Sequence, residues 1–159
     1  MKPASAYGDI LLNDKSLRDF QKKYMILLEV PENVRKKCKI LPAKIYCNKN
    51  IKQPLLNVLQ ELATTGLIKE IKSYDGCFNP RYIRGLEFKK ILSNHAYGVA
   101  LDFNAVDNPL GKSRLYNIED GRNPWSQDFI NVWRKHGWTN GYEWTRSDGM
   151  HFEIGDVDV

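Results

Sequence analysis

The sequence predicts one compact domain in which helices and short strands are mixed. The chain has 159 residues, of which 42% are hydrophobic, and this is enough to form a single core. Segments with the helical spacing of apolar residues are separate from segments in which apolar and polar residues alternate, as they do in strands. We therefore expect one domain over residues 1–159, with an N-terminal helical and strand part at 1–65 and a second part at 66–159 that carries the polar motifs.

Helical spacing is clearest in residues 53–65, where leucines recur every three or four positions and Gly66 follows as a stop. Residues 16–25 and 126–136 have the same spacing over shorter distances, so a helix is expected in each. A short strand is expected at residues 44–47, which are partly β-branched or aromatic and are bounded by turn-forming residues.

Two further strands are expected in the second half of the chain. In residues 99–104 the apolar side chains alternate with others, so Asp102 lies on the face away from the core. Residues 150–154 show the same alternation, with His151 on the polar side. Residues 107–124 are rich in Asn, Gly, Pro and Asp, and we expect a long irregular connection there.

Composition limits the class of protein. The net charge is +5, with 24 Lys and Arg against 19 Asp and Glu spread along the whole chain, which favours an anionic partner such as a cell wall, a membrane surface or nucleic acid. Charged residues interrupt positions 1–20, so no export signal is expected, and the longest apolar run, 25–28, is too short to span a bilayer. The three cysteines lack paired spacing, and we expect free, buried thiols.

Four polar residues form the most specific pattern. His95, Asp102 and His151 could supply three nitrogen and oxygen ligands to zinc and leave one position open for water, as in catalytic rather than structural sites. Asp148 precedes the last ligand by three residues, and we expect it to lie across a tight turn at Gly149. From there it could accept a proton from the zinc-activated water and pass it to a leaving amine.

Other residues near these motifs are candidates for supporting roles. Either Arg81 or Arg84 could hold an oxyanion or a substrate carboxylate through a forked pair of hydrogen bonds, and Arg81 is favoured. Ser93 is expected to form a local hydrogen bond beside the first ligand rather than to act as a nucleophile. Glu153 either orients a ligand imidazole or faces solvent, and Trp144 either lines a substrate groove or packs in the interior.

Taken together, the motifs resemble a known family, the zinc D,D-carboxypeptidases and L-alanyl-D-glutamate endopeptidases, which includes VanY-type enzymes and bacteriophage endolysins. The resemblance covers roughly residues 65–155, and it is greatest for the endolysin-type branch because of residues 74–85. The motifs that carry it surround the four polar residues: Ser93-x-His95, Gly98-x-Ala100-x-Asp102, Trp144, and Asp148-x-Met150-His151-Phe152-Glu153.

The resemblance implies an α+β fold of the Hedgehog/D-Ala-D-Ala peptidase type, in which a small antiparallel sheet carries the zinc site and helices pack on its other face. It also implies Zn²⁺ ligation by His95, Asp102 and His151, with Asp148 as catalytic base and Arg81 as the substrate or transition-state clamp. Several relatives have Glu at the position of the base, so Asp148 reaches one methylene less far.

The expected function is hydrolysis of an amide bond in peptidoglycan stem peptides, as an L-alanyl-D-glutamate endopeptidase of the endolysin type. Such an enzyme would act as a monomer, without nucleic acid or stable membrane insertion, and would stay in the host bacterial cytoplasm until its release to the wall. Three alternatives remain open: a D-Ala-D-Ala carboxypeptidase or dipeptidase of the same fold, a zinc-stabilised binding module without turnover, and a nucleic-acid binder suggested by charge alone.

Overall fold

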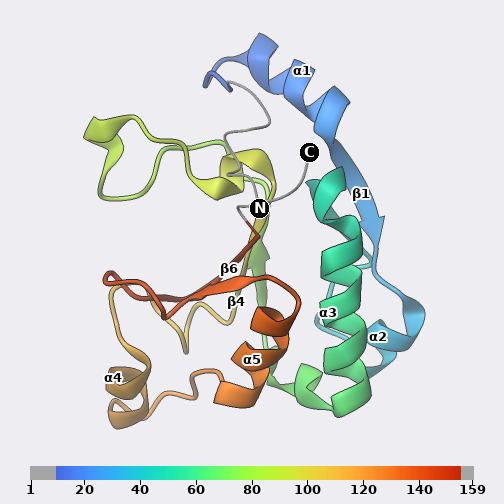
Figure 1. The fold of residues 1–159 in the computed structure, drawn as a ribbon, viewed down its shortest axis with the longest axis vertical. Helices are drawn as coiled ribbons and strands as arrows, with labels where there is room; N and C mark the ends of the chain where they lie inside the picture. Colours follow the sequence, from blue (N-terminus) through green and yellow to red (C-terminus); the bar gives the residue numbers. More distant parts are fainter. Residues whose placement is uncertain (1–9, 155–159) are drawn as a thin grey trace.

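A computed structural model describes residues 10–154 and shows a mixed α/β architecture with two small antiparallel sheets (Figure 1). The first sheet pairs β1 (Met25–Glu29) with β2 (Lys44–Asn48). The second sheet has the strand order β3-β4-β6-β5. Its strands are β3 (Tyr74–Gly76), β4 (Ala100–Phe103), β6 (Asp148–Glu153) and β5 (Thr139–Gly141).

Helices surround the two sheets. Figure 1 shows α3 beside β1 and α2, and α5 below the strands β4 and β6. The α-helices are α1 (Asp14–Tyr24), α2 (Glu32–Lys37), α3 (Lys52–Thr65), α4 (Arg114–Glu119) and α5 (Gln127–Lys135). Within residues 10–154, four short 3-10 helices lie between them: η2 (Lys49–Ile51), η3 (Leu67–Glu70), η4 (Glu87–Lys89) and η5 (Asn94–Tyr97).

All three predicted helices and all three predicted strands are present, with ends that differ by a few residues. Asn13 caps α1 by accepting a hydrogen bond from the amide of Ser16, and Ser126 caps α5 in the same way through the amide of Phe129. Gly66 ends α3 with a φ of 82°, a left-handed conformation that glycine adopts at little cost.

Two elements were not anticipated, and one segment differs from the expectation. The apolar run at 25–28 is a strand, β1, which follows α1 directly. The helix α2 follows Pro31, whose fixed φ suits the residue before a helix. The segment 107–124 is not wholly irregular: Ser113 accepts a hydrogen bond from the amide of Tyr116 and so starts the short helix α4.

Aromatic side chains join α5 to one face of the four-stranded sheet. Trp133 stacks on Phe152 of β6, with ring centroids 4.4 Å apart, and lies 5.8 Å from Phe103 of β4. All three side chains are fully buried, and each large ring removes on the order of 150–250 Å² from water. This packing fixes one face of the sheet and leaves the opposite face of β4 and β6 for polar side chains.

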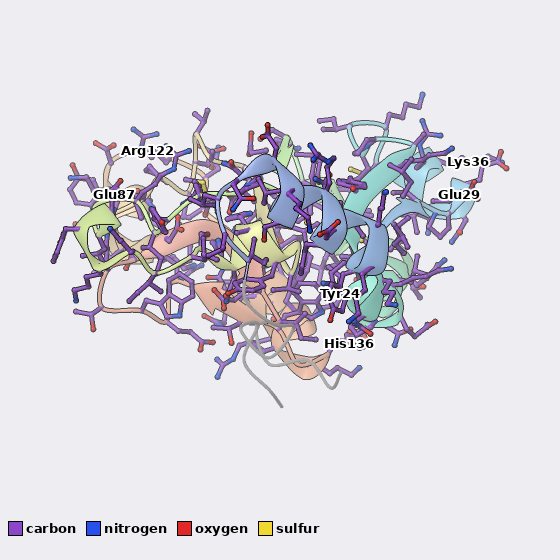
Figure 2. The ribbon with its side chains drawn as sticks, turned by 90° about the horizontal axis from the view of Figure 1, so that it is seen from above. Tyr24, Glu29, Lys36, Glu87, Arg122 and His136 are labelled. Atoms are coloured by element: carbon purple, nitrogen blue, oxygen red, sulfur yellow. The ribbon has the colours of Figure 1, made fainter. Side chains whose placement is uncertain are left out.

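Contacts at the end of α5 connect it to α3. Nε2 of His136 and Nζ of Lys135 lie 3.2 Å and 2.8 Å from the same carboxylate oxygen of Glu61. Figure 2 shows His136 at the edge of the molecule, well away from Glu87 and Arg122 at one end.

The three cysteines are free and buried, as expected. No helix within residues 10–154 combines the length and the apolar character that crossing a membrane requires.

Candidate metal centre

Three segments bring His95, Asp102 and His151 together. His95 lies in η5, while Asp102 on β4 and His151 on β6 are directly opposite each other in the antiparallel pairing. Gly98 connects η5 to β4 with a φ of 68°, and a Cβ atom there would lie only 2.7 Å from the sulfur of Met25. The left-handed φ and the close approach of the backbone nitrogen of Asn48, 3.0 Å from such a Cβ atom, both favour glycine at this turn from the first histidine into the strand.

The three side chains form a compact triangle in which each pair is in contact through nitrogen or oxygen atoms. Nε2 of His95 lies 3.2 Å from Oδ2 of Asp102 and 3.2 Å from Nδ1 of His151. Nδ1 of His151 lies 3.2 Å from Oδ1 of Asp102. Ligand atoms at about 2.0–2.1 Å from a tetrahedral zinc ion lie about 3.3 Å apart. The three separations are close to this value, although the two that involve Asp102 end on different oxygens of its carboxylate. One ligand atom from each residue lies within 4.8 Å of the other two.

One oxygen atom of this triangle lacks a hydrogen bond. Oδ1 of Asp102 is buried and has no hydrogen-bond partner among the described residues, while Nδ1 of His151 lies 3.2 Å away. Unsatisfied buried oxygen atoms are rare and costly in folded proteins. A metal ion would satisfy this oxygen, and among the described residues His95, Asp102 and His151 form a group that could hold one.

Hydrogen bonds on the outer side of each ring set the tautomers of both histidines. Nδ1 of His95 lies 2.7 Å from the carbonyl oxygen of Cys77, and Nε2 of His151 lies 2.8 Å from Oε1 of Glu153. Both partners can only accept, so these nitrogens carry the proton. The remaining nitrogen of each neutral ring then directs its lone pair toward the triangle, as metal ligation requires.

Before a metal binds, when His151 is protonated, the charges of Asp102 and His151 stabilise each other. Burial opposes ionisation of Asp102, but its contacts with His151 and His95 outweigh this effect and hold the pKa of the carboxyl below its usual range. Burial likewise lowers the pKa of His151, but Asp102 and Glu153 outweigh it and raise that pKa to about 9. The site is therefore built to attract positive charge.

Asp148 lies beside this group, although not across a turn as the sequence suggested. Residues 148–153 are a strand, and the expected tight turn at Gly149 is wrong. Oδ2 of Asp148 lies 3.9 Å from Nδ1 of His151, and Oδ1 is buried without a hydrogen bond. Burial raises the pKa of this carboxyl, and the neighbouring charge of Asp102 raises it further. A raised pKa brings a carboxylate closer to the range of an effective general base.

A groove with two cavities, of about 530 and 360 Å³, passes over the site. Both cavities are lined by Arg81, Arg84, Leu110 and Asp148. The first extends toward the loop after β3, and the second is walled by the hairpin of residues 82–92, which projects from the body in Figure 1. Space for an extended ligand is therefore present on both sides of Asp148.

The two candidate arginines have different surroundings. Arg81 is half-buried: its Nη1 donates to the carbonyl of Tyr82 at 3.2 Å, and its Nε is buried without a partner among the described residues. Burial lowers the pKa of Arg81, and the charge of Arg84 lowers it further. Arg84 is exposed, and its carbonyl oxygen accepts a hydrogen bond from Arg146. Arg81 is thus the more buried of the two arginines that line the groove.

The other predicted residues lie around the triangle. Oγ of Ser93 accepts a hydrogen bond from the amide of His95 at 3.2 Å, which caps η5. The ring of Trp144 is 37% exposed and its centroid lies 5.1 Å from that of His151, so it forms part of the groove wall. Glu153 contacts His151 and does not simply face solvent.

The sequence did not predict three residues that support the site through hydrogen bonds without being candidate ligands. Asn94 donates to the carboxylate of Glu153, while Asn140 and Trp125 donate to backbone carbonyls of β6. Asn94 is adjacent to a motif histidine, which is a weak signal. Asn140 and Trp125 belong to no recognisable motif, because their partners in β6 lie 9 to 24 residues further along the chain.

Comparison with known proteins agrees with this geometry. Residues 87–154, somewhat less than half of the chain, match the model of a peptidase family described as D-alanyl-D-alanine carboxypeptidase. The match supports the predicted family and indicates a metallopeptidase, and it spans the triangle and Asp148. Arg81 and Arg84 lie before it. No curated protein and no solved structure matches the chain.

Proposed function

We propose that this protein is a zinc peptidase that hydrolyses the L-alanyl-D-glutamate bond in peptidoglycan stem peptides, on a fold of the Hedgehog/D-Ala-D-Ala peptidase type. The main observation in its support is the triangle of His95, Asp102 and His151, in which each pair of side chains approaches to 3.2 Å, close to the ligand spacing of tetrahedral zinc. Two imidazoles and one carboxylate leave a zinc ion with net positive charge and an open position, as catalysis needs.

In this proposal Nε2 of His95, a carboxylate oxygen of Asp102 and Nδ1 of His151 would hold the ion. When bound, zinc would supply Lewis acidity that activates water and polarises the substrate carbonyl. Asp148, which lines both cavities, accepts the proton of the attacking water and delivers it to the leaving amine. The guanidinium of Arg81, which also lines both cavities, stabilises negative charge on the substrate or in the transition state.

The shape and charge of the groove support an endopeptidase acting on an acidic peptide. Cavities on both sides of Asp148 allow the peptide to continue beyond the cleaved bond in either direction. Arg81, Arg84 and Arg146 line the second cavity and suit substrate carboxylates. The likeness to the endolysin-type branch is the reason to propose a phage lysis enzyme held in the host cytoplasm until it reaches the wall.

The second candidate is a D-Ala-D-Ala carboxypeptidase, which the family description favours. Incubation of the protein with purified peptidoglycan, followed by mass analysis of the soluble products, separates the two candidates. The endopeptidase predicts stem fragments that begin with D-glutamate and glycan fragments that keep L-alanine. Release of terminal D-alanine alone would show that the endopeptidase assignment is wrong.

A further inference from the structure

The pairing of β5 with β6 contains a large irregularity next to the site. Asn140 of β5 lies opposite Phe152, but the next residue, Gly141, lies opposite Asp148. Between these two pairs, β5 advances by one residue and β6 by four. Residues 149–151 of β6 therefore have no partner on β5 and form a large bulge. In a regular strand, residues three positions apart point to opposite faces. The bulge instead allows Asp148 and His151 to approach each other within 3.9 Å.

Side chains replace the strand hydrogen bonds that the bulge interrupts. Nδ2 of Asn140 donates to the carbonyl of Gly149 at 2.9 Å and to the carbonyl of His151 at 3.2 Å. Nε1 of Trp125 donates to the same Gly149 carbonyl at 2.8 Å. Oδ1 of Asn140 in turn accepts from the amide of Tyr142 at 3.0 Å. The Asn140 side chain is fully buried, and both ends of its amide are engaged.

We propose that Asn140 is a positioning residue for the reaction, one that holds the bulge of β6 so that Asp148 and His151 face the same site. This inference rests on the proposed function. Asn140 touches neither the substrate nor the metal. It acts through the carbonyl of His151, which belongs to a proposed ligand, and through that of Gly149, which follows the proposed base. An aspartate of equal size would present oxygen to both carbonyls and could not hold them.

The test compares Asn140→Asp with a matched change elsewhere, Asn48→Asp. Asn48 is also fully buried, donates from Nδ2 to the carbonyl of Tyr97 at 3.0 Å and accepts from the amide of Asn50 at 3.0 Å. Both variants should lower the melting temperature by similar amounts. Only Asn140→Asp should weaken zinc binding by about tenfold or more and lower kcat by at least as much, with KM unchanged within about twofold, because the groove walls remain.

Trp125→Phe provides a second variant in case Asn140→Asp does not fold. It removes one donor to the Gly149 carbonyl while a ring remains to stack on Phe129, whose centroid lies 4.1 Å away. A smaller loss of zinc affinity and kcat in the same direction is expected. Zinc affinity and kcat equal to those of Asn48→Asp in both variants would overturn the inference. A wild-type protein that neither binds zinc nor cleaves peptidoglycan would overturn the proposed function instead.

Discussion

Nε2 of His151 lies 2.8 Å from a carboxylate oxygen of Glu153, two residues further along the same strand. The other oxygen of Glu153 accepts a hydrogen bond from Asn94, which precedes His95 in the chain. One carboxylate thus connects the segments of both histidines. Partners of this kind fix the orientation of a ligand ring and raise its basicity, and their loss costs about 10–100-fold in metal affinity or activity.

Replacing Glu153 with Gln tests this connection. The Gln side chain can still accept from Nε2 of His151, but it has no charge to stabilise the ring, so zinc affinity should fall about tenfold while the fold is kept. A competitive zinc titration measures the change. Glu143→Gln is the control, because the exposed side chain of Glu143 forms an ion pair with Arg134 at 3.0 Å, away from both histidines. Equal affinities in the two variants would contradict a role for Glu153.

The pKa of His151 predicts how the metal-free protein responds to pH. Folding raises this pKa from 6.5 to about 9. Protonated His151 therefore adds to the free energy of unfolding, fully below about pH 6.5, and this contribution is lost as the pH rises through 9. Urea unfolding in the presence of a chelator should show this decline, and His151→Gln should remove it. The same slope in both proteins would exclude His151 as its source.

Arg81 and Arg84 should differ in their effect on turnover. Arg81 has a buried donor without a partner, whereas Arg84 is exposed. We expect Arg81→Ala to lower kcat/KM by roughly 10²–10³, the loss typical of a transition-state donor, and Arg84→Ala to lower it less than about tenfold. Steady-state kinetics on a purified stem peptide measures both values. A larger loss of kcat/KM in Arg84→Ala than in Arg81→Ala would show that Arg84, not Arg81, stabilises the substrate or the transition state.

The bulge in β6 also depends on a residue without a side chain. A Cβ atom at Gly149 would lie 2.1 Å from the ring of Tyr142. Gly149→Ala should therefore destabilise the fold by about 1–3 kcal/mol, the usual cost of overpacking. In the background of Tyr142→Ala the same change should cost much less, because the collision is gone. Thermal unfolding of the four proteins gives the comparison, and additive losses would contradict the predicted collision.

The sequence predicted those parts of the structure that depend on local pattern. The spacing of leucines in residues 53–65 and the alternation around Asp102 both correspond to observed elements, because side-chain period alone determines them. The bulge was not predictable in this way. It depends on Asn140 and Trp125, whose amide and indole donors meet β6 only after folding. The short spacing in the sequence predicts that Asp148 lies near His151, and the structure shows this. The predicted turn between them is wrong, because the bulge of a strand, not a turn, brings them together.

The most direct test of the account measures zinc content and peptidoglycan hydrolysis in the wild type and in Asp148→Asn. The wild type should bind one zinc ion per chain, lose activity to a chelator and regain it with zinc. Asp148→Asn should bind zinc equally well, because Asp148 is not one of the three proposed ligands, while kcat falls by about 10²–10⁴. Undiminished hydrolysis by the variant, or full activity of the wild type in the chelator, would contradict a metal site that works with Asp148 as its base.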